Sequence, residues 1–226
     1  MTVLQEIALR QSLTYGGFAV AALLALLYAI LLSHRPASVL KSAAATLPIV
    51  ALLVAAVASF AAPLIITALC VALITEIALS RGTNPAWWGG SIGIFALQTL
   101  FTLHFLRISN VADFLILPAI LAIVVALYTE FKLRKHRSPV PLLLRIHLVF
   151  ATVMMLAALC LRDNLMAQVG GVALFLSVLL FIAMQLSIFK SPQAGKFAAT
   201  ARWFLAFFAQ AAILAGAGFA QPLFSI

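Results

Sequence analysis

The fold of this chain is decided by stretches such as residues 166–189, which read MAQVGGVALFLSVLLFIAMQLSIF. This stretch contains no charged side chain. A helix needs about 20 predominantly apolar residues to cross the roughly 30 Å hydrocarbon core of a bilayer. Residues 166–189 therefore predict a transmembrane helix.

The rest of the chain repeats this pattern. It is 65% hydrophobic and 8% charged, with a mean hydropathy of +1.21, whereas a soluble domain carries about 25% charged residues. We predict an all-α polytopic membrane protein with eight transmembrane helices forming a single transmembrane domain over residues 1–226. The expected spans are about 14–33, 43–60, 63–80, 87–107, 111–131, 140–161, 166–189 and 197–218.

Two boundaries rest on particular residues. No charge separates the second span from the third, so Phe60 to Pro63 must form a tight turn, with the proline in the first turn of the next helix. The first apolar run lacks a small-x-small cleavage site before His34, which favours a retained span over a signal peptide. Residues 190–196 are interpreted as a turn.

The basic residues predict an orientation. Thirteen of the 14 Lys and Arg residues lie in connections or near span ends, and only Arg145 lies within a span. The connections after the first, third, fifth and seventh spans hold ten, namely Arg35, Lys41, Arg81, Lys132, Arg134, Lys135, Arg137, Lys190, Lys196 and Arg202. The opposite side holds Arg10, Arg107 and Arg162. Because cytoplasmic loops carry the excess of Lys and Arg, we expect both termini outside and the basic loops in the cytoplasm, in a bacterial inner (plasma) membrane.

The same distribution bears on partners. The net charge of +9 lies in short loops between apolar spans, so we expect the bilayer and its lipids as partners and no nucleic acid. The basic loop 132–137 lies where anionic headgroups would attract it, although a role in topology alone explains it too. Cys70 and Cys160 fall inside apolar runs without ligand spacing, so we expect no metal and no cofactor.

Polar side chains within the spans are the functional candidates, because such groups are costly in hydrocarbon. We select Glu76 and Gln98 as candidate catalytic residues, and Arg145, His147 and Gln210 as candidate substrate-binding residues. Glu76 and Arg145 lie at similar predicted depth, so they are expected to pair, either as a structural salt bridge or as a poised carboxylate in a headgroup-level pocket. Glu130, near a cytoplasmic helix end, is expected to be solvated.

Small residues indicate where helices approach closely. Gly89, Gly90 and Gly93 include a GxxxG spacing, and Gly170 and Gly171 form a pair. Such residues let neighbouring helix backbones come together, and they are also compatible with an oligomer.

Three segments resemble the YhhN family of multispanning membrane proteins, which includes lysoplasmalogenases. Residues 68–79 (ALCVALITEIAL) resemble its Leu-rich segment ending in Gly-Asp, and residues 93–101 (GIFALQTLF) resemble its Gly/Phe run followed by His-x-x-Tyr. Residues 169–178 (VGGVALFLSV) resemble its Gly-Ala segment ending in Ser-Asp. The order and spacing of these segments hold over nearly the whole chain.

The resemblance implies the family's fold and hydrolysis of the vinyl ether of a lysoplasmalogen. Such hydrolysis needs a proton donor to the enol-ether carbon and a group that assists water. The resemblance places Glu76 at the first acid position and Gln98 at the histidine position, whereas Phe101 replaces the tyrosine and Val178 replaces the second acid. The sequence leaves two alternatives open: a lysophospholipid or ether-lipid hydrolase using Glu76, and a non-catalytic lipid binder or carrier with the same fold.

Overall fold

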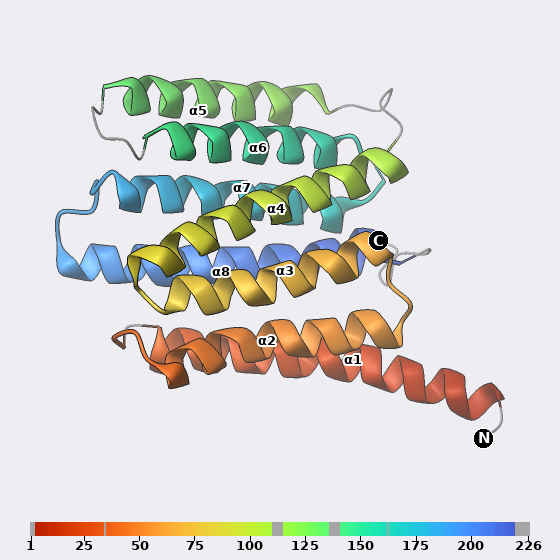
Figure 1. The fold of residues 1–226 in the computed structure, drawn as a ribbon. Coiled ribbons are helices and arrows are strands. Elements are labelled where there is room, and N and C mark those ends of the chain that lie inside the picture. Colours follow the sequence, from red (N-terminus) through yellow and green to blue (C-terminus); the bar gives the residue numbers. More distant parts are fainter. Residues whose placement is uncertain (1–2, 34, 110–114, 136–140, 162, 220–226) are drawn as a thin grey trace. The chain divides into compact units, whose positions relative to one another are not determined.

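The helical prediction is confirmed. A computed structural model describes residues 3–33, 35–109, 115–135, 141–161 and 163–219, and every regular element in them is helical (Figure 1). Eight of these helices are long and apolar enough to cross a membrane. They are α1 (Val3–Leu27, continued by the π-helical turn η1, Tyr28–Leu32), α2 (Val39–Ala58), α3 (Pro63–Ser80), α4 (Asn84–Ile108), α5 (Ile116–Arg134), α6 (Pro141–Leu159), α7 (Leu165–Gln185) and α8 (Pro192–Ala217).

Helix α1 begins at Val3, well before the predicted start near Thr14. The polar residues that seemed to precede the helix instead stabilise its first turns. Arg10 donates to the Glu6 carboxylate one helical turn earlier, at 2.8 Å from Nη2, and its Nη1 donates to the Ala58 carbonyl at the end of α2, at 3.2 Å. An (i, i+4) ion pair of this kind stabilises the part of the helix that precedes the apolar run.

The predicted turn at residues 190–196 is wrong over most of its length, because α8 already begins at Pro192. The Ser191 hydroxyl accepts a hydrogen bond from the Ala194 amide at 3.1 Å, which is a standard N-cap contact. Proline at the first helical position is also favourable, since its missing N–H has no partner to lose there. The pair Ser191-Pro192 therefore starts a helix.

Helix α7 ends at Gln185, before the predicted limit at residue 189. Ser187 adopts a positive φ of 52°. Its amide donates to the Met184 carbonyl, and the Ile188 amide donates to the Ala183 carbonyl at 3.1 Å. These two bonds form a Schellman motif, which terminates the helix. For the fifth and sixth spans, the predicted starts at 111 and 140 lie outside the described residues.

The turn predicted between the second and third spans is confirmed. Helix α2 ends at Ala58, two residues before the predicted limit at residue 60, and α3 begins at Pro63, as expected. Phe60 carries a positive φ of 54°, and its amide and that of Ala61 donate to the Val57 and Ala56 carbonyls. A second Schellman motif thus reverses the chain in four residues.

The chain separates into two compact units. The first unit comprises Met1–Leu97 and Leu214–Ile226, and within it α1 packs on α2 and α2 packs on α3 (Figure 1). Small residues set these contacts. A Cβ placed on Gly17 would lie 2.8 Å from the Ala55 Cβ, and one on Gly90 would overlap the Leu79 side chain of α3. The close approach predicted for the Gly89–Gly93 segment is therefore confirmed between α3 and α4.

The second unit comprises Gln98–Ile213, where α6 packs against both α5 and α7 (Figure 1). Gly171 of α7 faces Ala158 of α6, and Gly170 faces Ile213 of α8. The close approach predicted at Gly170 and Gly171 thus serves packing between helices of the same chain. Cys160 is buried and Cys70 is half-buried, and both are free thiols.

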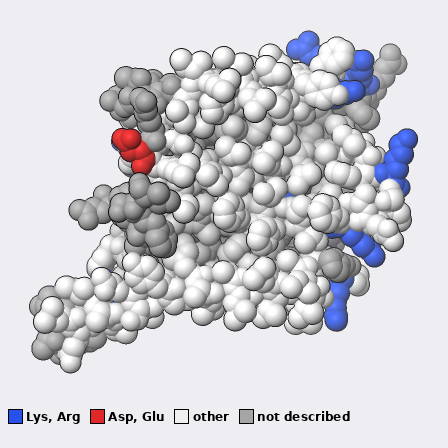
Figure 2. Space-filling model, turned by 180° about the vertical axis from the view of Figure 1, so that it is seen from behind, with Lys and Arg blue, Asp and Glu red and all other residues white. Residues whose placement is uncertain are grey.

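The surface is that of a protein surrounded by lipid. Many large apolar side chains are exposed, including Leu117 (79%), Leu121 (65%) and Ile74 (66%). In water such exposure would be unfavourable, whereas acyl chains solvate it. Figure 2 shows a mostly uncharged surface, with Lys, Arg and acidic side chains confined to its edges.

Within each unit most of the described basic residues gather at one helix end. In the first unit, Arg35, Lys41 and Arg81 lie where α1 and α3 end and α2 begins. In the second unit, one end carries Lys132, Arg134, Lys135, Lys190 and Lys196, where α5 and α7 end and α6 and α8 begin. Arg137 and Arg162, which also entered the charge count, lie outside the described residues.

Candidate functional site

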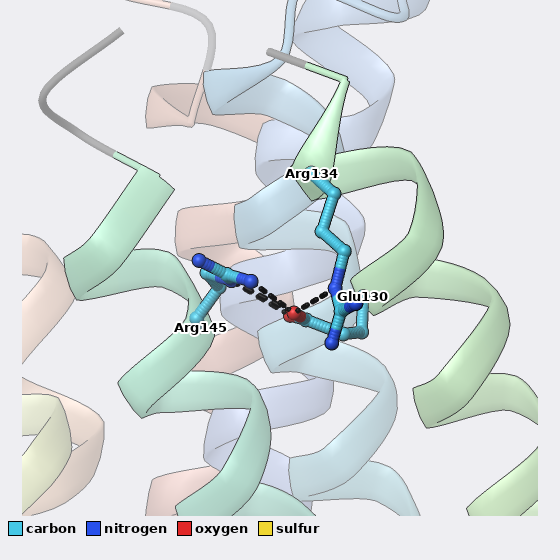
Figure 3. Close-up of polar contacts among 3 residues, drawn as sticks. All are labelled: Glu130, Arg134 and Arg145. Atoms are coloured by element: carbon cyan, nitrogen blue, oxygen red, sulfur yellow. Dashed lines mark hydrogen bonds and ion pairs between the residues drawn. The ribbon is translucent and has the colours of Figure 1, made fainter. Parts of the chain in front are cut away.

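The structure gives Arg145 a different carboxylate partner from the one predicted. Arg145 of α6 donates from Nε to the Glu130 Oε1 atom at 2.8 Å, and Arg134 donates from its Nε to the same oxygen at 3.0 Å (Figure 3). The expected pairing of Arg145 with Glu76 is therefore corrected to a pairing with Glu130. The expectation of a simply solvated Glu130 is also wrong, because its side chain is 24% exposed and bridges two guanidinium groups.

This pairing follows from the geometry of a helical hairpin. Helices α5 and α6 are antiparallel neighbours joined by the basic loop, and residues equally distant from the middle of that loop lie at the same height. Glu130 and Arg145 are related in this way. A search for opposite charges placed symmetrically about the loop would have found the pair in the sequence. The search by predicted membrane depth missed it because it treated Glu130 as outside the hydrocarbon.

Arg145 and His147 face different helices. Residues two apart on an α-helix point to nearly opposite sides. Arg145 reaches α5, while His147 is fully buried and its ring lies edge-on to Phe181 of α7, with centroids 5.9 Å apart. The two predicted substrate-binding residues therefore belong to different contacts of the same helix.

Three of the predicted site residues carry buried polar atoms that bond to none of the protein groups in the described part of the chain. They are both amide atoms of Gln98, both ring nitrogens of His147, and Oε1 of Gln210. A buried polar group left without a partner costs about 1–3 kcal/mol. These atoms can hydrogen-bond to a polar ligand or to water inside the second unit, which contains all three residues.

His147 and Gln210 lie at different heights in this unit. His147 is level with Phe181 of α7, whereas Gln210 is next to Ala209, whose carbonyl faces Gly170. Phe181 and Gly170 are 11 positions apart on α7, which corresponds to about 16 Å along the helix axis. The buried polar atoms of His147 and Gln210 are therefore separated by about 16 Å along the helix axis.

Glu76 lies in the first unit and is buried, with 6% exposure. It follows Thr75, whose side chain occupies the space beside Gly93: a Cβ on that glycine would overlap the Thr75 hydroxyl. Thr75 stands where the resemblance implies a glycine, and the missing Cβ on Gly93 of α4 accommodates this larger residue on α3. Glu76 is thus held at a close contact between two helices.

The position at which the resemblance implies a second acid is apolar in the structure as well as in the sequence. Val178 is 3% exposed on α7, and the neighbouring Ser177 hydroxyl donates to the Arg202 carbonyl of α8 at 2.9 Å. Phe101, where the resemblance implies a tyrosine, is fully buried and stacks on Phe105, with ring centroids 6.3 Å apart. Neither Val178 nor Phe101 can transfer a proton.

The fold and these residues define an integral membrane protein with buried amide, imidazole and carboxyl groups between its helices. Among the described residues, no group of three His, Cys, Asp or Glu side chains is arranged to hold a metal ion. Comparison with family models, with curated proteins and with solved structures found no match to this chain.

Proposed function

We propose that this protein binds a lysophospholipid within the membrane and hydrolyses its vinyl-ether bond, as the resemblance to the YhhN family implies. The observation that supports the proposal is the set of buried polar atoms without protein partners on Gln98, His147 and Gln210. They offer hydrogen bonds to a polar ligand in an interior otherwise lined by apolar side chains. A lipid with one acyl-type chain and a polar glycerophospho group matches both features.

The proposed chemistry assigns one role to each residue. The Glu76 carboxyl protonates the vinyl carbon that is not bonded to oxygen, and water adds to the resulting oxocarbenium carbon while returning a proton to Glu76. The hemiacetal then breaks into an aldehyde and the glycerophospho alcohol, with one water consumed. In the second unit, Gln98, His147 and Gln210 are assigned to hydrogen-bond the lipid.

Arg145 is assigned to the phosphate. Glu130 accepts from Nε and Nη2 of this guanidinium, which carries five N–H donors in all. In the described part of the chain, this leaves the Nη1 donors for a phosphate oxygen. Arg145 lies near the basic end of α6, where a headgroup would be located, and Glu130 holds the guanidinium in place.

The test is aldehyde release from an alkenyl lysophospholipid by the purified protein. We expect the Glu76→Gln variant to lose activity by a factor of ~10²–10⁴, the usual contribution of a general acid. The control is Glu6→Gln, which removes an exposed carboxylate on α1 and should turn over like the wild type. Equal turnover by wild type and Glu76→Gln would remove Glu76 from the mechanism.

A second candidate function, a non-catalytic lipid binder or carrier, is favoured by Val178. A buried valine where the family has an acid removes one of the two carboxyl groups on which the hydrolysis is expected to depend. This candidate predicts that the purified protein retains lysophospholipid and releases no aldehyde. Detection of hydrolysis would exclude it.

We further propose the orientation in which both termini are outside, in a bacterial inner membrane. The support is the gathering of basic residues at one helix end within each unit, which the positive-inside rule assigns to the cytoplasm. An oligomer through small-residue faces remains a proposal. The glycines at 90, 93, 170 and 171 already contact helices of the same chain.

A further inference from the structure

Helix α5 ends in a cluster of cations that the proposed site does not use. Lys132, Arg134 and Lys135 lie in or next to its last turn, and all three are exposed. We call these three residues the α5 basic end. In a membrane, this end of the helix meets the lipid headgroups.

Two of these cations are positioned by aromatic rings. The Lys132 ammonium lies 5.3 Å from the Tyr128 ring centroid, and the Lys135 ammonium lies 4.4 Å from that of Phe131. The spacing of these four residues, at i, i+3, i+4 and i+7, places them on one face of the helix. Tyr128 and Phe131 are themselves 61% and 56% exposed. The cations are thus held along a lipid-facing surface by cation–π contacts.

The local charge is positive. Glu130, the nearby carboxylate, accepts from Arg134 and Arg145. Neither Lys132 nor Lys135 forms an ion pair with a carboxylate in the described part of the chain. Their charges are therefore available to an anion from outside the protein.

The same helix continues as an apolar surface away from these cations. Leu117, Leu121, Val124 and Leu127 are each more than half exposed, at successive intervals of three or four residues. From Leu117 to Phe131 the helix extends about 21 Å. Only 17% of the most apolar window of α5 is buried within the protein. This surface matches the length and chemistry of an acyl chain.

We propose that the α5 basic end is a binding site for an anionic phospholipid. The phosphate lies between the ammonium groups of Lys132 and Lys135, and one acyl chain runs along the exposed face of α5. Charge complementarity selects an anionic over a zwitterionic lipid. The site is independent of the proposed hydrolysis, because none of its residues takes part in it.

The test measures lipid retained by the purified full-length protein in detergent, by native mass spectrometry, during titration with phosphatidylglycerol or phosphatidylcholine. Working with purified protein removes any effect of the charges on membrane orientation. We expect wild type to retain phosphatidylglycerol preferentially. The double variant Lys132→Gln/Lys135→Gln should bind it roughly 25-fold more weakly, at about fivefold per lysine.

The matched control is Lys190→Gln/Lys196→Gln, which removes two exposed lysines from the same end of the second unit. It should bind phosphatidylglycerol like the wild type. Equal affinity of wild type and the Lys132/Lys135 variant, or equal losses in the two double variants, would overturn the proposal. So would a wild type that binds both lipids alike. Raising the salt concentration gives a second readout without mutation, since it should weaken phosphatidylglycerol binding alone.

Discussion

The contact between α7 and α8 at Gly170 permits a quantitative test of the packing. A Cβ on Gly170 would lie 2.6 Å from the Cγ1 atom of Ile213 and 3.0 Å from both the Ala209 carbonyl oxygen and the Ile213 amide nitrogen. Two of these three atoms belong to the backbone, and the Ile213 side chain is fully buried. The Gly170→Ala variant must therefore displace helix α8.

The expected cost follows from two opposing terms. Overpacking a well-packed interior costs about 1–3 kcal/mol, whereas replacing glycine by alanine within a helix gains about 1 kcal/mol. The Gly195→Ala variant serves as the control, because Gly195 also lies in a helix of the second unit and an added Cβ meets nothing within 4 Å. The helix term cancels between the two variants. Their free energies of unfolding should therefore differ by about 1–3 kcal/mol, with Gly170→Ala the less stable.

The assay is unfolding of the purified protein in mixed micelles of increasing sodium dodecyl sulfate fraction, followed by circular dichroism. Both variants should begin with the helicity of the wild type, since neither substitution removes a helical hydrogen bond. A shift of the transition to lower dodecyl sulfate for Gly170→Ala alone would agree with the close contact. Identical transitions for the two variants would refute the reasoning, because they would show that α8 does not approach α7 at this point.

The Ser187→Gly variant should be more stable than wild type by about 1 kcal/mol in the same titration, because glycine adopts the positive φ of this position without strain. Phe60→Gly relieves the same strain but should gain less, since the Arg10 guanidinium lies 4.0 Å from the centroid of the Phe60 ring; an equal gain would show that this contact contributes nothing. For orientation, a single cysteine is introduced into a variant whose native cysteines are serine. With an impermeant thiol reagent, Leu4→Cys should react in intact cells and Ala37→Cys only after permeabilisation, and the reverse pattern would place the termini inside.

The spans were predictable because their signals are local. Helix α3 matches its predicted limits, since Pro63 marks its start and Arg81-Gly82 its end. The limits of α1 and α8 were missed where polar residues belong to the helix itself. Both Arg10 and Ser191 are polar residues typical of loops, whereas Arg10 pairs with Glu6 along α1 and Ser191 caps the start of α8. Polarity alone does not separate a helix terminus from a loop; the hydrogen bond that the side chain makes does.

The site was less predictable because its partners are set by helix packing. The choice of Gln98, His147 and Gln210 needed only the rule that polar groups within a span are costly, and all three are buried. The partner of Arg145 needed knowledge of which helices are neighbours. Depth along the membrane normal does not by itself identify the partner of Arg145, because several carboxylates can lie at the same depth. Adjacency in a short hairpin is the stronger constraint, because it brings Glu130 to Arg145 wherever the other helices lie.

That constraint changes the chemical interpretation of Arg145. With Glu76 as its partner, Arg145 would have favoured the charged form of the proposed acid and so opposed proton donation. With Glu130 as its partner, the guanidinium is held by a carboxylate that has no part in the proposed reaction. The remaining donors of Arg145 are then available for the proposed phosphate contact, and the proposed proton donor Glu76 is buried in the first unit. The pairing with Glu130 therefore separates the role proposed for Arg145 from the role proposed for Glu76.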